Sequence, residues 1–154
     1  MPDSLLLFLQ EQAQNPYKAR MWSSTSQSIP ASPFYNRITF DTVSYDPNSN
    51  LTTGASSQYT APVDGYYFAC GRVSQATSPG TRTIVTLYVN GAEAQRGFDG
   101  TSATAVGGPS SGILQLNKGD LVALYMGIGS AVSTEGFPSA PALQFLTVHY
   151  LSPL

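Results

Sequence analysis

The segment GYYFACGRVS at 65–74 most constrains what this chain can fold into. Successive side chains of a β-strand point to opposite faces of a sheet. Tyr66 and Phe68 therefore line one face, and Tyr67 and Ala69 line the other. Neither set is suited to water, so the sequence predicts a strand that must be covered on both sides.

The rest of the chain, after Pro16, has the residue pattern of an all-β domain. Runs of β-branched and aromatic residues alternate with clusters of Gly, Pro, Asn and Ser, and no helical period survives. The spacing predicts an antiparallel sandwich. Its expected strands are 34–43, 56–61, 65–74, 83–90, 92–98, 111–116, 120–128 and 143–151.

Two turn signals support this pairing. Asn90-Gly91 separates two strand-like runs, and a type I′ hairpin turn favours this pair because it needs positive φ at both central residues. At the other corner, Pro62 fixes φ and we expect Gly65 to take the positive φ that lets the chain turn.

The last expected strand, 143–151, is also apolar on both faces. Helices would normally cover the second face of such a sheet, and none is expected after residue 16. We therefore predict that a second subunit covers it. The residues expected at this interface are Tyr67, Ala69, Leu146, Val148 and Tyr150.

Residues 1–20 form a predicted N-terminal arm, ahead of a β domain at 21–154. Asp3 or Ser4 can cap a helix that Asn15-Pro16 ends. Its apolar residues surround the helix, so one partner surface cannot cover them. The arm is expected to sit in a pocket of a partner, to pack in a bundle with copies of itself, or to fold back under its own domain. The anchor candidates are Leu5, Leu6, Leu7, Phe8 and Leu9.

This apolar run has no basic segment before it and no small-residue cleavage site after it. It is also far shorter than the ~20 residues that cross a bilayer. We therefore expect a protein made in a cytoplasm, with no membrane partner.

Charged residues make up 10% of the chain, against roughly 25% in an ordinary soluble domain. So few charged residues indicate that other subunits cover much of the surface, as in a chain that belongs to an assembly. The net charge of −2 removes the case for a nucleic-acid partner. Cys70 is the single cysteine, so no intrachain disulfide can form.

No residue pattern predicts catalysis, a cofactor or a metal site. His149 is the sole histidine, on an expected buried strand, where a packed structural role is favoured over that of a general base. The chain is expected not to be an enzyme.

The corner and the strand after it resemble the signature of the globular head of complement component one, subcomponent q, and of the wider tumour necrosis factor superfamily. The matching positions are Tyr59, Pro62, Gly65, Tyr66 or Tyr67, and Phe68, with further matches at 38–43, 87–91 and 111–122. This resemblance spans 34–151 and implies a jelly roll. It also implies a compact homotrimer whose inner sheets, containing the strand after Gly65 and the final strand, meet around a three-fold axis. Some relatives of the complement head hold calcium near the trimer apex, which makes Asp64 and Asp99 the calcium candidates here, although a role in shaping turns is the better interpretation.

Residues 26–41, SQSIPASPFYNRITFD, are similar to the segment that introduces such domains in bacteriophage structural proteins. The implied function is a non-enzymatic trimer on the virion surface, decorating a capsid or forming a short head or tail fibre. Its partners would be capsid or tail proteins, with contact to a host surface also open. The alternative is a free-standing binding module that recognises a glycan or a protein receptor.

Overall fold

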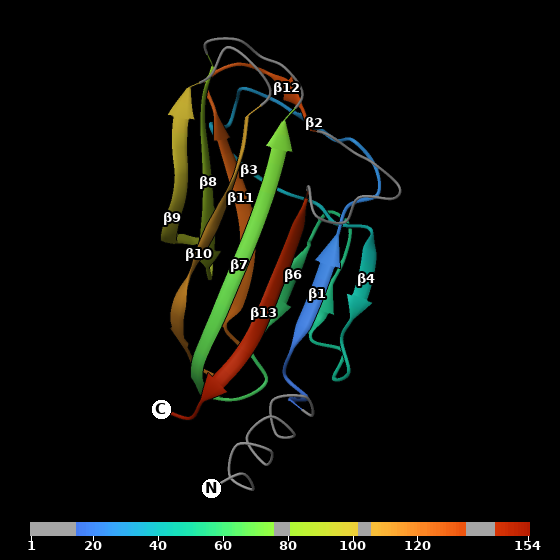
Figure 1. The fold of residues 1–154 in the computed structure, drawn as a ribbon, viewed down its shortest axis with the longest axis vertical. Coiled ribbons are helices and arrows are strands. Elements are labelled where there is room, and N and C mark those ends of the chain that lie inside the picture. Colours follow the sequence, from blue (N-terminus) through green and yellow to red (C-terminus); the bar gives the residue numbers. More distant parts are fainter. Residues whose placement is uncertain (1–14, 76–80, 102–105, 135–143) are drawn as a thin grey trace, which may run out of the picture.

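The computed structural model describes residues 15–75, 81–101, 106–134 and 144–154, and every regular element there is a β-strand (Figure 1). Within these ranges no helix is long and apolar enough to cross a membrane. The strands are β1 Ala19–Trp22, β2 Ser28–Ile29, β3 Tyr35–Arg37, β4 Thr42–Tyr45, β5 Leu51–Thr52, β6 Gln58–Thr60, β7 Gly65–Gln75, β8 Arg82–Val89, β9 Ala92–Thr101, β10 Val106–Leu116, β11 Leu121–Ile128, β12 Val132–Ser133 and β13 Phe145–Ser152.

Two antiparallel sheets form a sandwich. The front sheet has the order β10-β7-β13-β1-β4. The back sheet has the order β5-β6-β11-β8-β9, and β3 also pairs with β11. Strands far apart in the sequence are neighbours in both sheets, as in a jelly roll.

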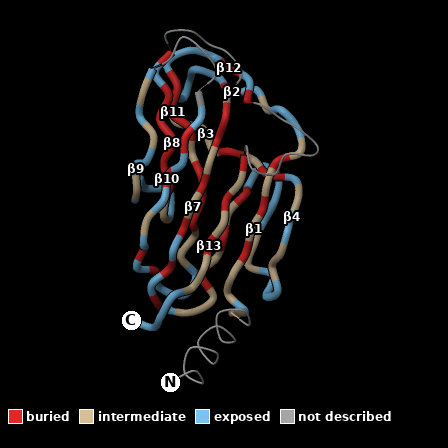
Figure 2. Tube along the Cα trace, viewed as in Figure 1, coloured by how far each residue is buried: buried red, intermediate tan, exposed pale blue. Residues whose placement is uncertain are grey.

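The core lies between the two sheets (Figure 2). Buried residues alternate with more exposed ones along β13, whereas β8 and β11 are buried along most of their length. Removing each large apolar side chain from water contributes about 1.5–3 kcal/mol before ordering costs. The largest fully buried side chains are Tyr59, Tyr67, Phe40, Met21, Ile38, Ile84, Leu87, Leu116, Leu124, Met126, Ile128 and Leu146.

One side of the sandwich is closed where β9 of the back sheet meets β10 of the front sheet. The hydroxyl of Ser110 donates a hydrogen bond to the backbone oxygen of Gln95 over 2.7 Å. Glycine allows this approach, because a β-carbon on Gly97 would overlap the carbonyl of Pro109, and one on Gly108 would collide with the ring of Phe98.

The all-β prediction is confirmed, and every expected strand from 56–61 onward has a counterpart. The single strand expected at 34–43 is wrong, since β3 lies in the back sheet and β4 in the front sheet. Between them the chain crosses the sandwich. The amide of Ile38 donates to the oxygen of Leu124 in the back sheet, and that of Asp41 donates to the oxygen of Trp22 in the front sheet.

The predicted boundary at residue 20 falls inside β1, which pairs with both β13 and β4. Contacts with the sandwich begin earlier still. The side-chain amide of Asn15 donates to the oxygen of Tyr150 over 2.7 Å, and Tyr17 packs edge-on against the Tyr150 ring. The expected helix and its anchor residues Leu5, Leu6, Leu7, Phe8 and Leu9 lie outside the described residues.

Candidate functional site

Strand β7 begins at a corner where a neighbouring strand packs very close to the backbone, and the backbone angle at this corner is ordinary. The φ of Gly65 lies outside the left-handed region, so the expected positive φ is wrong. A β-carbon there would lie 2.5 Å from Cε2 of Tyr150 and 2.6 Å from the oxygen of Ser152. Gly65 is therefore required because β13 passes directly over it. Pro62, the other corner residue, is half-buried at the turn.

The hairpin between β8 and β9 has positive φ at both Asn90 (52°) and Gly91 (81°), as a type I′ turn requires. The Asn90 side chain also joins this hairpin to the next turn. Its amide donates to the Asp120 carboxylate over 2.8 Å, and its oxygen accepts from the amide of Leu121 over 2.9 Å.

The residues predicted for the subunit interface face the core of their own chain. Tyr67, Ala69, Leu146 and Val148 have no exposed surface in the single subunit. Tyr150 is half-buried, with its ring packed edge-on against Tyr67 at 5.3 Å between centroids. The four fully buried side chains cannot contact a second subunit, so for them the prediction chose the wrong face of the sheet.

The opposite face of the front sheet, which we call the front face, carries the exposed apolar side chains. Phe68 lies directly across from Ile113 of β10 and from His149 of β13, so these three residues form a row across the sheet. Ile113 is 65% exposed, and Phe68 and its strand neighbour Tyr66 are each 40% exposed. Large apolar side chains thus gather on β10 and β7 of this sheet.

The same face is cationic. The guanidinium of Arg20 stacks over the ring of Phe145 at 4.3 Å, and Arg72 is the register partner of Phe145 on the other side. The Nε of Arg72 is buried and has no hydrogen-bond partner. None of the five strands of the front sheet contains Asp or Glu. This face therefore joins apolar and cationic groups without a carboxylate among its strand residues.

His149 lies within this face. Its Nε2 is 3.0 Å from the hydroxyl oxygen of Tyr45 and 3.4 Å from that of Thr147. Burial lowers the pKa of His149 below its ordinary value, and the charge of Lys18 lowers it further. Burial raises the pKa of the neighbouring Cys70 thiol. No carboxylate orients the imidazole among these contacts, so the group lacks the arrangement of a catalytic triad.

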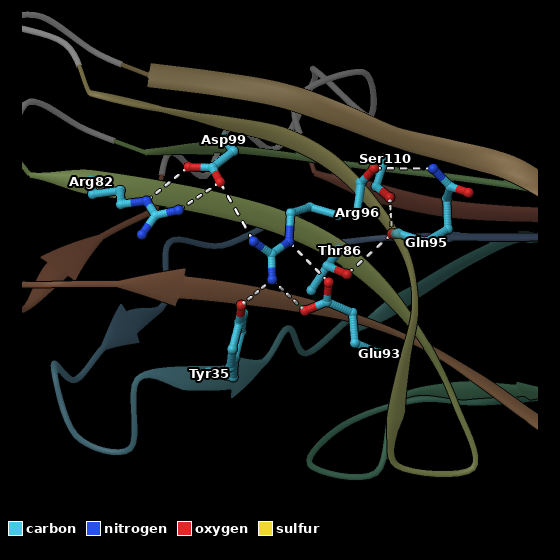
Figure 3. A network of polar contacts seen from close by, with 8 residues as sticks. All are labelled: Tyr35, Arg82, Thr86, Glu93, Gln95, Arg96, Asp99 and Ser110. Carbon is cyan, nitrogen blue, oxygen red and sulfur yellow. Dashed lines mark hydrogen bonds and ion pairs between the residues drawn. The ribbon is translucent and has the colours of Figure 1, made fainter.

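The outer face of the back sheet is covered differently, by side chains of the chain itself (Figure 3). Tyr35 lies across Gly127, and its hydroxyl accepts a hydrogen bond from Arg96 over 3.1 Å. Arg96 also forms an ion pair with Glu93 at 2.9 Å. Ile84, which alternates with the core residue Val85, is consequently only 1% exposed.

The two calcium candidates have other roles. Asp64 accepts a hydrogen bond from the amide of Lys118 over 2.7 Å. Asp99 lies in β9 instead of a turn, and hydrogen bonds from Arg82 hold its pKa below the usual range. In the described ranges no three His, Cys, Asp or Glu side chains come together as metal ligands.

Sequence reasoning could have found the front face. Arg72 and Cys70 share the side of β7 that holds Phe68, and Thr147 and His149 share the matching side of β13. Polar groups on one side of an apolar strand indicate the side that does not enter the core.

No protein-family model and no curated protein matches the chain. Solved structures do. The globular domain of zebrafish complement 1qA matches with a TM-score of 0.62 and 12% identity, over 89% of this chain and 98% of that one.

Two further structures match over similar lengths. Eiger TNF from S. frugiperda has a TM-score of 0.65 and 13% identity, over 89% of this chain and 93% of that one. Murine APRIL has a TM-score of 0.59 and 13% identity, over 87% and 98%. The chain therefore has the jelly-roll fold of complement 1q globular domains and tumour necrosis factor-like proteins.

Proposed function

We propose that this chain is a non-enzymatic homotrimeric head, assembled through the front face and mounted by its N-terminal segment on the surface of a bacteriophage particle. One observation carries the assembly. Ile113, Phe68 and Tyr66 are exposed on the neighbouring strands β10 and β7, although Leu114, Tyr67 and Ala69 on the opposite face of the same strands are buried. A contiguous apolar patch of this kind is typical of a surface that another protein covers.

A second copy of the chain is the occupant that we favour. The resemblance of residues 34–151 to trimeric jelly rolls points to it, as does the similarity in fold to complement 1q and tumour necrosis factor-like domains. In such a trimer the front sheets of three copies surround one axis. The doubly apolar strands β7 and β13 are then covered by their own core on one side and by neighbouring subunits on the other.

The position of Asn15, the first described residue, supports a mount at one end. Asn15 bonds to Tyr150 near the end of β13, so the chain enters the sandwich beside its own C-terminus (Figure 1). A rotation axis keeps equivalent atoms at the same height, so three copies present this end to the same side. Three weak anchors on one side of a trimer can bind a particle with high avidity.

The bacteriophage setting rests on the resemblance of residues 26–41 and on the low charge of the chain. Its test is whether the chain copurifies with intact particles at fixed stoichiometry. Deletion of residues 2–13 leaves the Asn15 and Tyr17 contacts in place. The shortened chain should remain a folded trimer and should no longer bind particles, and undiminished binding would exclude the mount.

Sedimentation tests the assembly separately. The wild-type chain should sediment as a trimer at micromolar concentration. Ile113→Glu should sediment as a folded monomer, because it places a carboxylate in an apolar contact. Ile113→Leu is the matched control and should remain trimeric. A wild-type monomer would overturn the proposal.

A further inference from the structure

The single histidine of the chain lies in the middle of the proposed subunit contact. His149 is the cross-strand partner of Phe68, which in turn faces Ile113. Its Nε2 is held 3.0 Å from the hydroxyl of Tyr45 on β4. A surface that covers Phe68 and extends onto β13 therefore also removes this imidazole from water.

The groups around His149 do not favour a charged imidazole. Lys18 precedes β1 and disfavours the imidazolium electrostatically. Apart from Lys18, the titratable and charged side chains of the strands that face it are Arg20 on β1, Tyr45 on β4, and Tyr66, Cys70 and Arg72 on β7; β10 contributes Ile113 and Gln115, which do not titrate. None of these groups is a carboxylate. Burial of the thiol keeps Cys70 neutral through the range in which histidine titrates.

We propose that His149 makes assembly through the front face dependent on pH, so that a neutral imidazole permits the trimer and a protonated one opens it. This inference rests on the proposed trimer and deepens it by adding its regulation. Protonation would add a fourth positive group to Lys18, Arg20 and Arg72 while the contact excludes water. In a trimer, the same positive charge would be added three times around one axis.

The direction follows from proton linkage. A buried cation without a partner is costly, so each subunit that enters the trimer must release the proton of His149. With one proton released per subunit, the trimerisation constant falls by up to about a thousandfold per pH unit below the pKa of the free subunit. That pKa already lies below the ordinary value of histidine. The trimer is thus stable near neutral pH and weakens in mild acid.

Sedimentation at about pH 7.5 and about pH 5.5 tests this, since ordinary histidine titrates near 6.5 and ordinary carboxyl groups near 4. The wild-type trimer should dissociate at the lower pH, with circular dichroism showing that the subunits stay folded. His149→Gln keeps a polar side chain beside Tyr45 but cannot gain a charge. It should remain trimeric at both pH values.

The possible outcomes separate the two proposals. A wild-type monomer at about pH 7.5 overturns the trimer and this inference with it. A trimer of equal stability at both pH values overturns only the inference, as does a His149→Gln trimer that dissociates in acid like the wild type.

A second measurement does not depend on how His149→Gln folds. The chain has one histidine, so NMR can follow one imidazole through its titration. Its pKa should be at least about one unit lower in the wild-type trimer than in the monomeric Ile113→Glu chain, corresponding to a tenfold effect per subunit. Equal values in the two chains would refute the inference.

Discussion

Leu124 fills the space that a side chain at Gly71 would occupy, since a β-carbon on Gly71 would lie 2.5 Å from Cδ1 of Leu124. Gly71 belongs to β7 in the front sheet, and Leu124 belongs to β11 in the back sheet. Leu124 is fully buried. The two sheets therefore meet here through a bare backbone on one side and a branched side chain on the other.

Gly71→Ala should lower the free energy of unfolding by about 1–3 kcal/mol, because the added methyl group overpacks a closed core. Gly129→Ala is the matched control. A β-carbon at Gly129 meets nothing within 4 Å, and its φ lies outside the left-handed region. Urea unfolding of both variants provides the measurement. Equal stabilities would show that the contact between Gly71 and Leu124 relaxes without strain.

Substitution by asparagine distinguishes the two reasons for glycine in this fold. Asparagine tolerates positive φ, and the space around Gly91 is open, so Gly91→Asn should leave the melting temperature nearly unchanged. Gly65→Asn should destabilise the chain strongly, because its β-carbon meets the Tyr150 ring and the backbone oxygen of Ser152. If Gly65→Asn melted like Gly91→Asn, the corner would depend on backbone angle after all.

The effect of a glutamate on folding and assembly should depend on which face of the front sheet carries it. Val148→Glu places a charge in the core of the subunit and should cost several kcal/mol, enough to unfold the chain. Phe68→Glu changes a half-exposed side chain, so the subunit should fold but no longer assemble. Circular dichroism measures folding, and sedimentation measures assembly. A folded Val148→Glu chain would contradict the assignment of faces.

Alkaline pH should weaken the fold through Tyr67. Burial raises the pKa of Tyr67 to about 12, above the 10.0 of an exposed tyrosine. The unfolded chain therefore loses this proton first, and the stability is complete below pH 10.0 and is lost as the pH rises towards about 12. Urea unfolding between neutral pH and pH 11 measures this loss.

Tyr67→Phe is the control for that measurement. In the wild type the hydroxyl of Tyr67 donates a 2.7 Å hydrogen bond to the oxygen of Val63. The variant lacks this bond, so its free energy of unfolding at neutral pH should be lower by about 0.5–1.5 kcal/mol. It should then lose less stability in alkali than the wild type. An identical alkaline loss in both chains would assign the effect to other tyrosines, including Tyr59, whose pKa burial also raises.

The sequence predicted that β7 and β13 are covered on both faces, but the alternation of their large apolar residues alone did not reveal which face enters the core. Alternation divides β7 into two sets, and both sets begin with large apolar residues. Tyr67 looks no more buried than Phe68 on that basis. The difference comes from Leu124, which needs the bare backbone of Gly71 opposite it, and that relationship joins two strands far apart in the chain.

The ends of some strands were predicted wrongly because they too depend on contacts between segments far apart in the chain. The expected strand at 34–43 continues without a turn signal, although the chain crosses from one sheet to the other within it. Gly107-Gly108-Pro109 reads as a turn in the sequence, yet it lies inside β10 opposite Arg72, Val73 and Ser74. Small residues serve there to admit Phe98 and Ser74 at close range, and local composition does not distinguish that use from a turn.

The closed side of the sandwich limits how many copies can associate. Long unpaired strand edges allow chains to add one after another without end. Here the long strands β9 and β10 meet each other through Ser110 and Gln95, and the strands at the other sheet edges, β4 and β5, have four and two residues. Among the described strands, neither free edge is long enough to extend a ladder. Growth into a fibre is thus disfavoured, and association through a face around one axis ends when the ring is complete.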